Sequence, residues 1–259
     1  MAKCPTIKFE MLTKEENIRI IKEIANFPEE EILDLRNRLI VRFLDMYNIL
    51  NKPNKEELIE ELISKLYDEE VELLPKKIKK YRIRWHKENE YFMYQLESYL
   101  HVDWPPRAKE IKCYVGLIPD ALTDLENMTI YLDCNLEIKP AKFEIANSLC
   151  QFLYYEKWCK IYPSSNYEDF KYPSLVWQLS QISTDPILNS NVLNKAFDNL
   201  DFNYKTYDYF YNDDNIKIMN EIKEIYMRDE IKLSIPNSYN YLVQERGKNE
   251  KETKYNIWR

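Results

Sequence analysis

Four polar residues on two expected helices could form one chemical site. Asn147 and Gln151 are four residues apart, so a helix over residues 141–160 places both on one face. Ser148 is next to Asn147, and a second expected helix over residues 173–182 carries Gln181, whose amide could reach the same face. Amides and hydroxyls are weak metal ligands but satisfy one another's hydrogen bonds, so these residue types favour a paired polar patch.

The elements before this region are expected to be helical. Thr13 with Glu16 forms a capping box ahead of apolar residues at helical spacing. A second helix is expected to begin at Pro28, and a third is expected to be capped by Asn54. The buried stripe of that third helix is expected at Leu58, Leu62 and Leu66. A helical pattern then continues over residues 69–100, with Pro75 as a start or a kink.

Strand signals appear only in the middle of the chain. Segments 111–117 and 128–132 are rich in β-branched and aromatic residues and are separated by turn residues. Helix is expected again over residues 214–228. The sequence therefore predicts a mainly α fold with a small central β-sheet, in the α+β class. We expect a helical N-terminal region over residues 1–103, a second region over 104–246 packed on it as one unit, and a frayed polar tail over 247–259.

The two candidate helices resemble those of a family of uncharacterised proteins from low-GC Gram-positive bacteria and their phages with a zincin-like metallopeptidase fold. In that family the first helix carries His-Glu-x-x-His followed by aromatic residues and a Trp. The second carries Trp-x-Leu-Ser-Glu followed by Asp-Pro-Ile-Leu. The matching segments here are Asn147-Ser-Leu-Cys-Gln, followed by Trp158, and Trp177-Gln-Leu-Ser-Gln, followed by Asp185-Pro-Ile-Leu. The resemblance extends to the strand at 111–119 and the helical N-terminal half, and it implies a zincin-like helical core.

The chain departs from that family pattern at each position that would perform the chemistry. The resemblance implies that Asn147 replaces the first histidine ligand and Ser148 the general-base glutamate. It also implies that Gln151 replaces the second histidine ligand and Gln181 the glutamate ligand. Catalytic zinc needs imidazole or carboxylate donors, and a general base must accept a proton from the water that zinc activates. We therefore expect a pseudoenzyme with no catalytic residue, no metal and no cofactor.

Two alternatives to the pseudoenzyme stay open. The resemblance could be a coincidence between helix pairs, with the polar residues forming an ordinary satisfied core patch. The chain could also be an active metal-dependent peptidase with a shifted site that uses Glu144, Glu156 or Asp185.

Composition excludes several other kinds of site. The chain of 259 residues contains only two glycines, which disfavours glycine-rich phosphate loops and nucleophile elbows. Its two histidines, His86 and His101, lie outside any recognisable nucleophile motif. The five cysteines include no C-x-x-C pair and are expected to be free, mostly buried thiols.

A basic segment is the main candidate for a charged binding surface. Seven Lys or Arg and no acid lie between residues 76 and 87, including the binding candidates Lys79, Arg82 and Arg84. Tyr81 and Trp85 interleave with them, a pattern that could provide a stacking and phosphate-binding face. The alternative is a pair of adjacent helices of opposite charge that lie against each other, because the preceding stretch is acidic.

An aromatic segment near residue 207 is the second binding candidate. It concentrates the tyrosines Tyr204, Tyr207, Tyr209 and Tyr211, which suit protein recognition or could instead plug the end of a helical core. The net charge of −7 disfavours direct nucleic-acid binding, and no long apolar run suggests a membrane span.

We therefore expect a cytoplasmic protein with a protein partner. The hypothesis is a phage or mobile-element inhibitor of a host nucleic-acid-processing defence enzyme, of the anti-CRISPR kind.

Overall fold

The computed structural model describes residues 4–27, 33–172, 174–195 and 213–256. Within these ranges the chain is mostly helical and contains a single four-stranded sheet, which confirms the predicted mainly α class with a small central sheet. The chain divides into two compact units, one formed by residues 1–93 and 105–148 and the other by residues 94–104 and 149–259. This division differs from the expected boundary at residue 103, because an N-terminal strand joins the first helices to the sheet.

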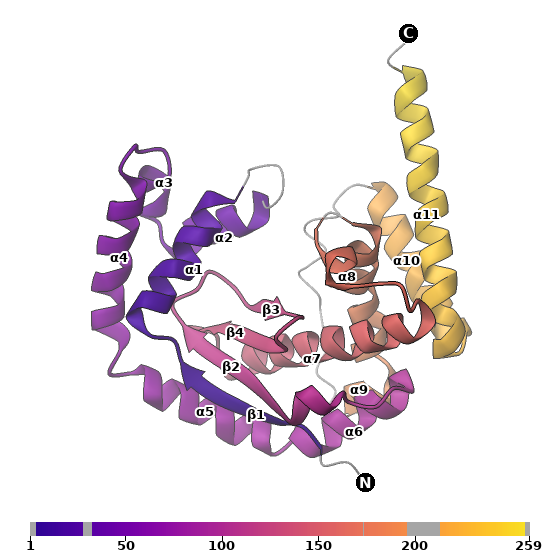
Figure 1. Ribbon diagram of the computed structural model, residues 1–259, viewed down its shortest axis with the longest axis horizontal. Helices are drawn as coiled ribbons and strands as arrows, with labels where there is room; N and C mark the ends of the chain where they lie inside the picture. Colours follow the sequence, from indigo (N-terminus) through magenta and orange to yellow (C-terminus); the bar gives the residue numbers. More distant parts are fainter. Residues whose placement is uncertain (1–3, 28–32, 173, 196–212, 257–259) are drawn as a thin grey trace. The chain divides into compact units, whose positions relative to one another are not determined.

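The sheet belongs to the first unit and has the order β1-β2-β4-β3 (Figure 1). Its strands are β1 (Thr6–Met11), β2 (Glu110–Gly116), β3 (Leu122–Asp124) and β4 (Thr129–Asp133). β1 and β4 pair with β2 in parallel, whereas β3 pairs with β4 in antiparallel orientation. The two predicted strands correspond to β2 and β4, and β1 and β3 are strands that the sequence analysis did not predict. Alternate residues of the strands are apolar and buried, and they line one face of the sheet: Phe9, Ile111, Cys113, Val115, Ile130 and Leu132.

Six helices precede β2 in the chain. They are α1 (Lys14–Asn26), α2 (Leu33–Arg42), α3 (Met46–Ile49), α4 (Lys55–Glu70), α5 (Leu74–His86) and α6 (Asn89–Leu100). The capping box at Thr13 and Glu16 is present at the start of α1. The residues expected to start the second helix, 28–32, lie outside the described residues. Pro75 sits in the first turn of α5, so it starts that helix and does not kink a longer one.

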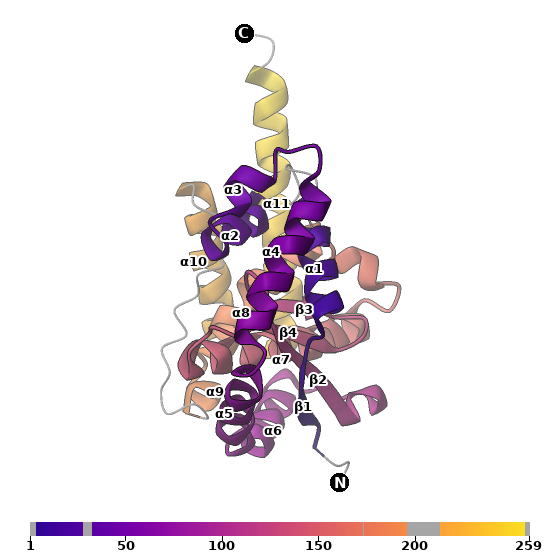
Figure 2. The same cartoon turned by 90° about the vertical axis from the view of Figure 1, so that its left-hand side faces the viewer.

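The buried stripe of α4 lies one residue away from the predicted one. Ile59, Ile63 and Tyr67 are buried, and the predicted leucines flank them at intermediate exposure. Both stripes are apolar, and packing of α4 against α1 selects the first of them. Figure 2, which views the same cartoon from the side, shows α1 and α4 next to each other. Asn54 flanks α4 but its side chain makes no capping hydrogen bond.

Asn17 fastens α1 to the sheet. Its side chain is fully buried, its Nδ2 donates to the carbonyl oxygen of Thr13 at 2.7 Å, and its Oδ1 accepts from the backbone N–H of Leu117 at 2.6 Å. The approach is so close that a Cβ at Gly116 would lie 2.5 Å from Asn17 Oδ1, so only glycine fits at the end of β2.

The second unit contains the long helix α7 (Ile138–Ile161) from residue 149 onward, together with α8 (Leu175–Leu188), α9 (Asn191–Lys195), α10 (Asp213–Arg228) and α11 (Ile231–Asn256). Helices α8, α10 and α11 pack on one another. α11 continues past Gly247, so the segment expected to fray is helical as far as Asn256. No helix in the described ranges is long and apolar enough to cross a bilayer.

Candidate functional site

The predicted amide pair is present in the second unit. Gln151 on α7 is 8% exposed, and its Nε2 donates a hydrogen bond to Oε1 of Gln181 on α8 at 3.3 Å. The two residues are thirty positions apart in the sequence. The structure therefore confirms that the second helix brings its amide to the face of α7 that carries Gln151.

α7 buries Gln151 because apolar residues lie on nearly every side of the helix. Leu149, Cys150, Phe152 and Leu153, the nearest neighbours in the chain, are all 1% exposed or less. A helix that is apolar all round must lie inside a core, so its few polar side chains need partners there.

The other two residues of the predicted site lie in the first unit. Ser148 is 1% exposed, its Oγ donates to the carbonyl oxygen of Glu144 at 3.0 Å, and it lies 2.8 Å from Thr123 Oγ1 on β3. Asn147 is 8% exposed on the same helix. The structure thus joins Gln151 to Gln181 and Ser148 to Thr123, a partner that the sequence analysis missed because β3 itself was not predicted.

The donor set at these positions does not fit a catalytic zinc ion. Asn147, Gln151 and Gln181 offer neutral carboxamide oxygens, whereas zinc selects thiolate, imidazole or carboxylate. Cys150 lies between Asn147 and Gln151 in the helix, but complete burial raises the pKa of its thiol far above the ordinary value and keeps it protonated. Within the described ranges, no group of three or more His, Cys, Asp or Glu side chains could hold a metal ion.

The carboxylates considered for a shifted site occupy different environments. Asp185 on α8 is 4% exposed, and its Oδ2 lies 2.6 Å from Nζ of Lys223 on α10. Its Oδ1 accepts from Asn189 Nδ2 at 2.6 Å, so both oxygens of this carboxylate have partners. Glu144 and Glu156 are half-buried on α7. Nothing in the local sequence of α8 indicated the lysine on α10.

Three hydroxyl groups are buried in the same helical unit as the amide pair. Those of Tyr154 on α7, Ser183 on α8 and Tyr226 on α10 are shielded from solvent. Burial raises the pKa of the Tyr154 and Tyr226 phenols well above their usual value. The phenols therefore stay protonated and act as polar core groups and not as bases.

Neither histidine belongs to the buried polar groups. His86 is exposed at the last position of α5. His101 is exposed directly after α6 and has a φ of 52°, the left-handed conformation that often ends a helix.

The basic segment forms α5, but its aromatic residues do not lie on the charged face. Lys79, Arg82 and Arg84 are exposed, whereas Tyr81 and Trp85 are only 5% and 2% exposed. Trp85 Nε1 donates to Asn89 Oδ1 at 2.8 Å, and the Tyr81 hydroxyl donates to backbone carbonyls beyond β4. The predicted stacking face is therefore wrong, because the aromatic rings continue the apolar stripe that packs α5 against the sheet.

The expected mutual neutralisation of α4 and α5 is also largely wrong. Lys77 Nζ contacts Glu70 at 2.9 Å, and this is the one ion pair between the two charge blocks in the described ranges. The other acids of α4 that form ion pairs use lysines of α1. The tyrosine candidates Tyr204, Tyr207, Tyr209 and Tyr211 lie outside the described residues.

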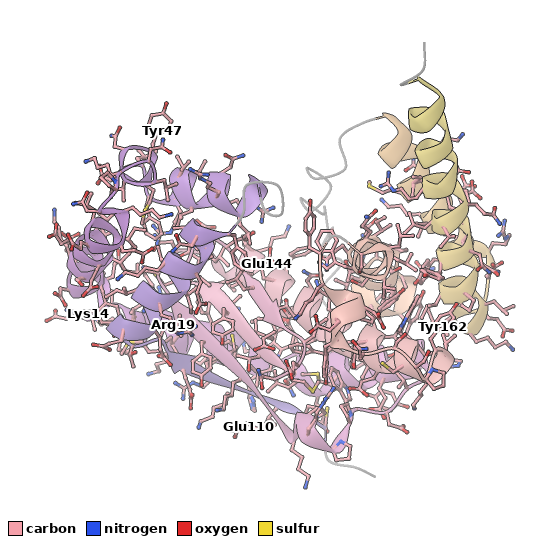
Figure 3. All side chains as sticks on the ribbon, turned by 45° about the horizontal axis from the view of Figure 1, so that its top comes forward. Lys14, Arg19, Tyr47, Glu110, Glu144 and Tyr162 are labelled. Carbon is pink, nitrogen blue, oxygen red and sulfur yellow. The ribbon has the colours of Figure 1, made fainter. Side chains whose placement is uncertain are left out.

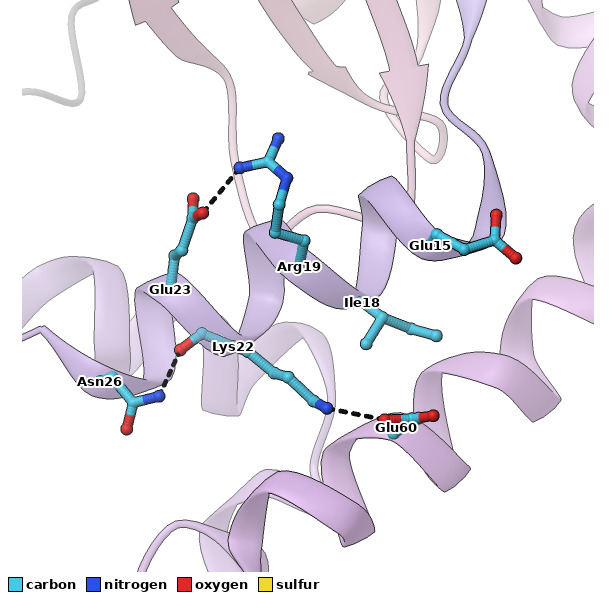
Figure 4. Close-up of a pocket in the computed structure, with 7 residues that line it drawn as sticks. All are labelled: Glu15, Ile18, Arg19, Lys22, Glu23, Asn26 and Glu60. Carbon is cyan, nitrogen blue, oxygen red and sulfur yellow. Dashed lines mark hydrogen bonds and ion pairs between the residues drawn. The ribbon is translucent and has the colours of Figure 1, made fainter.

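A surface hollow lies along α1 and α4 in the first unit (Figure 4). Arg19 and Glu23 form an ion pair at 2.7 Å, and Lys22 reaches Glu60 at the same distance. These charges neutralise one another along the seam where the two helices pack, so the hollow is accounted for by helix packing. All five cysteines are free, and three of them are buried, as expected.

Comparison with known proteins gives no match to any family model, to any curated protein or to any solved structure.

Proposed function

We propose that this protein acts by binding another macromolecule and that it carries a metallopeptidase-like site in which amides stand at the ligand positions. The hydrogen bond between Gln151 and Gln181 is the observation that supports this proposal. Two side chains from different helices meet at 3.3 Å, at the positions where the resembled family carries two ligands.

The chemistry of the pair argues against hydrolysis. The Gln181 oxygen already accepts a hydrogen bond from Gln151, and neither amide can take up a proton near neutral pH. At the position of the general base, the Ser148 hydroxyl donates to a backbone carbonyl of its own helix. At these positions hydrogen bonds occupy Gln151, Gln181 and Ser148, and none of the three side chains is a base that could activate water.

A protein partner is supported by an apolar patch on the first unit. Val41 at the end of α2, Leu44 in the following turn and Tyr47 in α3 are 77%, 77% and 69% exposed. Figure 3 shows Tyr47 pointing away from the ribbon. Exposed apolar residues this close together are typical of protein–protein contact surfaces. The partner class that we propose is a nucleic-acid-processing enzyme, which the protein would inhibit.

Restoring the family's ligands tests the proposal. The variant Asn147→His, Ser148→Glu, Gln151→His, Gln181→Glu should bind about one zinc ion per chain by elemental analysis after gel filtration, since it has three zinc donors. The wild-type chain, purified and loaded in the same way, should retain none. A matched variant with Ser148→Ala in place of Ser148→Glu should still bind zinc, which separates metal binding from water activation.

Each result bears on a different part of the proposal. Stoichiometric zinc in the wild-type chain would overturn the pseudoenzyme and point to a shifted site. Failure of a folded four-residue variant to bind zinc, with its far-UV circular dichroism unchanged, would overturn the metallopeptidase-like scaffold.

A further inference from the structure

The exposed face of α5 in the first unit is strongly positively charged. It carries six cations and no acid: Lys76, Lys79, Lys80, Arg82, Arg84 and Lys87, the last directly after the helix. All six are exposed, and within the described ranges none of them has an ion-pair partner. α5 lies beside β1 in Figure 1, and its opposite face packs on β1 and β2.

The cations surround the exposed half of the helix. At about 100° per residue, Lys76 and Lys87 lie at the crest, with Ile83 beside them. Arg82 and Arg84 fall on opposite flanks, about 120° and about 80° from Lys76. The charges extend along roughly 16 Å of helix at 1.5 Å per residue. The surface is therefore convex, and it is positive on its crest and on both flanks.

We propose that this face of α5 binds the phosphate backbone of double-stranded nucleic acid. A major groove about 12 Å wide admits an α-helix and places phosphates along both sides of it, which matches cations on both flanks. Lysine supplies four of the six charges; it is depleted from protein–protein interfaces but is common in phosphate contacts. An acidic protein surface therefore fits this face less well than a duplex does.

The burial of the aromatic residues selects duplex over single strand. Proteins that hold single strands stack bases on exposed aromatic rings, and Tyr81 and Trp85 are turned into the core. Ile83, at 50% exposure, is the large apolar residue on the charged face. Contacts made by point charges alone read no sequence, so binding is expected to be independent of sequence and sensitive to salt.

The net charge of −7 does not prevent such binding. The acids of α4 that have no ion-pair partner in the described ranges, such as Glu57 and Glu61, lie on a different helix from the six cations. At 0.1 M salt the Debye length is about 10 Å, so cations that touch the phosphates are screened much less than acids that lie farther from them. The overall negative charge is expected to slow association and to confine binding to α5.

The test is fluorescence anisotropy of a labelled 20-base-pair DNA duplex titrated with the full chain. If all six cations contact phosphates, raising the salt from 50 to 200 mM should weaken wild-type binding on the order of 1000-fold. The variant Lys79→Gln, Arg82→Gln, Arg84→Gln should bind more weakly at 50 mM, and its log–log salt slope should be shallower by about 2.7. The control variant Lys52→Gln, Lys65→Gln, Lys109→Gln removes the same charge from scattered exposed sites and should bind like wild type.

Several results would overturn the inference. They are absence of wild-type binding at 50 mM salt, an equal loss in the control variant, and equal affinity for a single strand of the same length. Competition by polyglutamate as effective as that by unlabelled duplex would assign the face to an acidic protein instead. Preference for vesicles of anionic phospholipid over the duplex would assign it to a membrane surface. The inference goes beyond the proposed function and does not use the amide site, so the zinc experiment and the anisotropy experiment test the two proposals independently.

Discussion

Replacing one amide of the Gln151–Gln181 pair should lower the free energy of unfolding by more than half as much as replacing both amides does. Methionine matches glutamine in length and helix propensity but cannot form the hydrogen bond. Gln151→Met leaves the Gln181 oxygen facing an apolar side chain, and Gln181→Met leaves the Gln151 amide group without this acceptor. A net hydrogen bond contributes about 0.5–1.5 kcal/mol, and an unsatisfied buried group costs about 1–3 kcal/mol.

The geometry places this pair at the lower end of these ranges. The distance of 3.3 Å is long for an N–H···O bond, and Gln181 is only half-buried, so water can partly replace the lost partner. We expect each single variant to lose about 1 kcal/mol of unfolding free energy. The double variant should lose about the same as either single variant, since apolar groups then face each other. The expected coupling energy is therefore about 1 kcal/mol.

Urea unfolding followed by circular dichroism measures this coupling through a double-mutant cycle. Gln244→Met is the matched control, because Gln244 is exposed on α11, and it should change stability by less than about 0.5 kcal/mol. Additivity of the two single effects within about 0.3 kcal/mol would refute the reasoning, since it would mean that the two amides do not interact.

Three further predictions concern groups that hold each unit together. Asn17→Ala should lower the free energy of unfolding in urea by about 1–3 kcal/mol, because it leaves the buried backbone N–H of Leu117 without its acceptor. Lys223→Met should lower the free energy of unfolding by about 1–2 kcal/mol, because it leaves the buried carboxylate of Asp185 without its cation. Adding Asp185→Asn should recover part of that loss. The free energy of unfolding should fall as the pH rises above about 9: burial raises the pKa of Cys113 and Cys150 in the folded chain, so only the unfolded chain releases these protons. A urea midpoint that stays unchanged from pH 8 to 10.5 would contradict this last prediction.

The sequence predicted the helices of the candidate site because their signals are local. Residues four apart share a face in any helix, so Asn147 and Gln151 were expected on one side of it. The second segment is mostly apolar, so the helix that carries Gln181 was expected to pack inside the protein. The pairing of the strand β1 gave no comparable signal. Ile7, Phe9 and Met11 do alternate with Lys8 and Glu10, so the segment had a short strand signal, but its partner strand lies about one hundred residues away in the chain and no local pattern indicates that pairing.

The error at Tyr81 and Trp85 had a signal that could have prevented it. Together with Leu74 and Ile78 they repeat at the spacing of a buried helical stripe, so the period indicated the core and not the surface. The ion pair of Asp185 with Lys223 had no such signal, because a single pair of opposite charges on distant helices is common in any charged sequence.

The amide pair also bears on how a scaffold could keep its fold after losing its metal. Under the proposed function, two ligands that once met at an ion are replaced by two side chains that meet at a hydrogen bond. The helices α7 and α8 then need no new contact, because Gln151 and Gln181 span the gap directly at 3.3 Å. The loss of the metal would therefore leave the surrounding core intact. Selection could then act on exposed surfaces such as the apolar patch of Val41, Leu44 and Tyr47 and the charged face of α5. Both surfaces lie in the first unit, whereas the amide pair lies in the second, so variants of one should leave the other's measured behaviour unchanged.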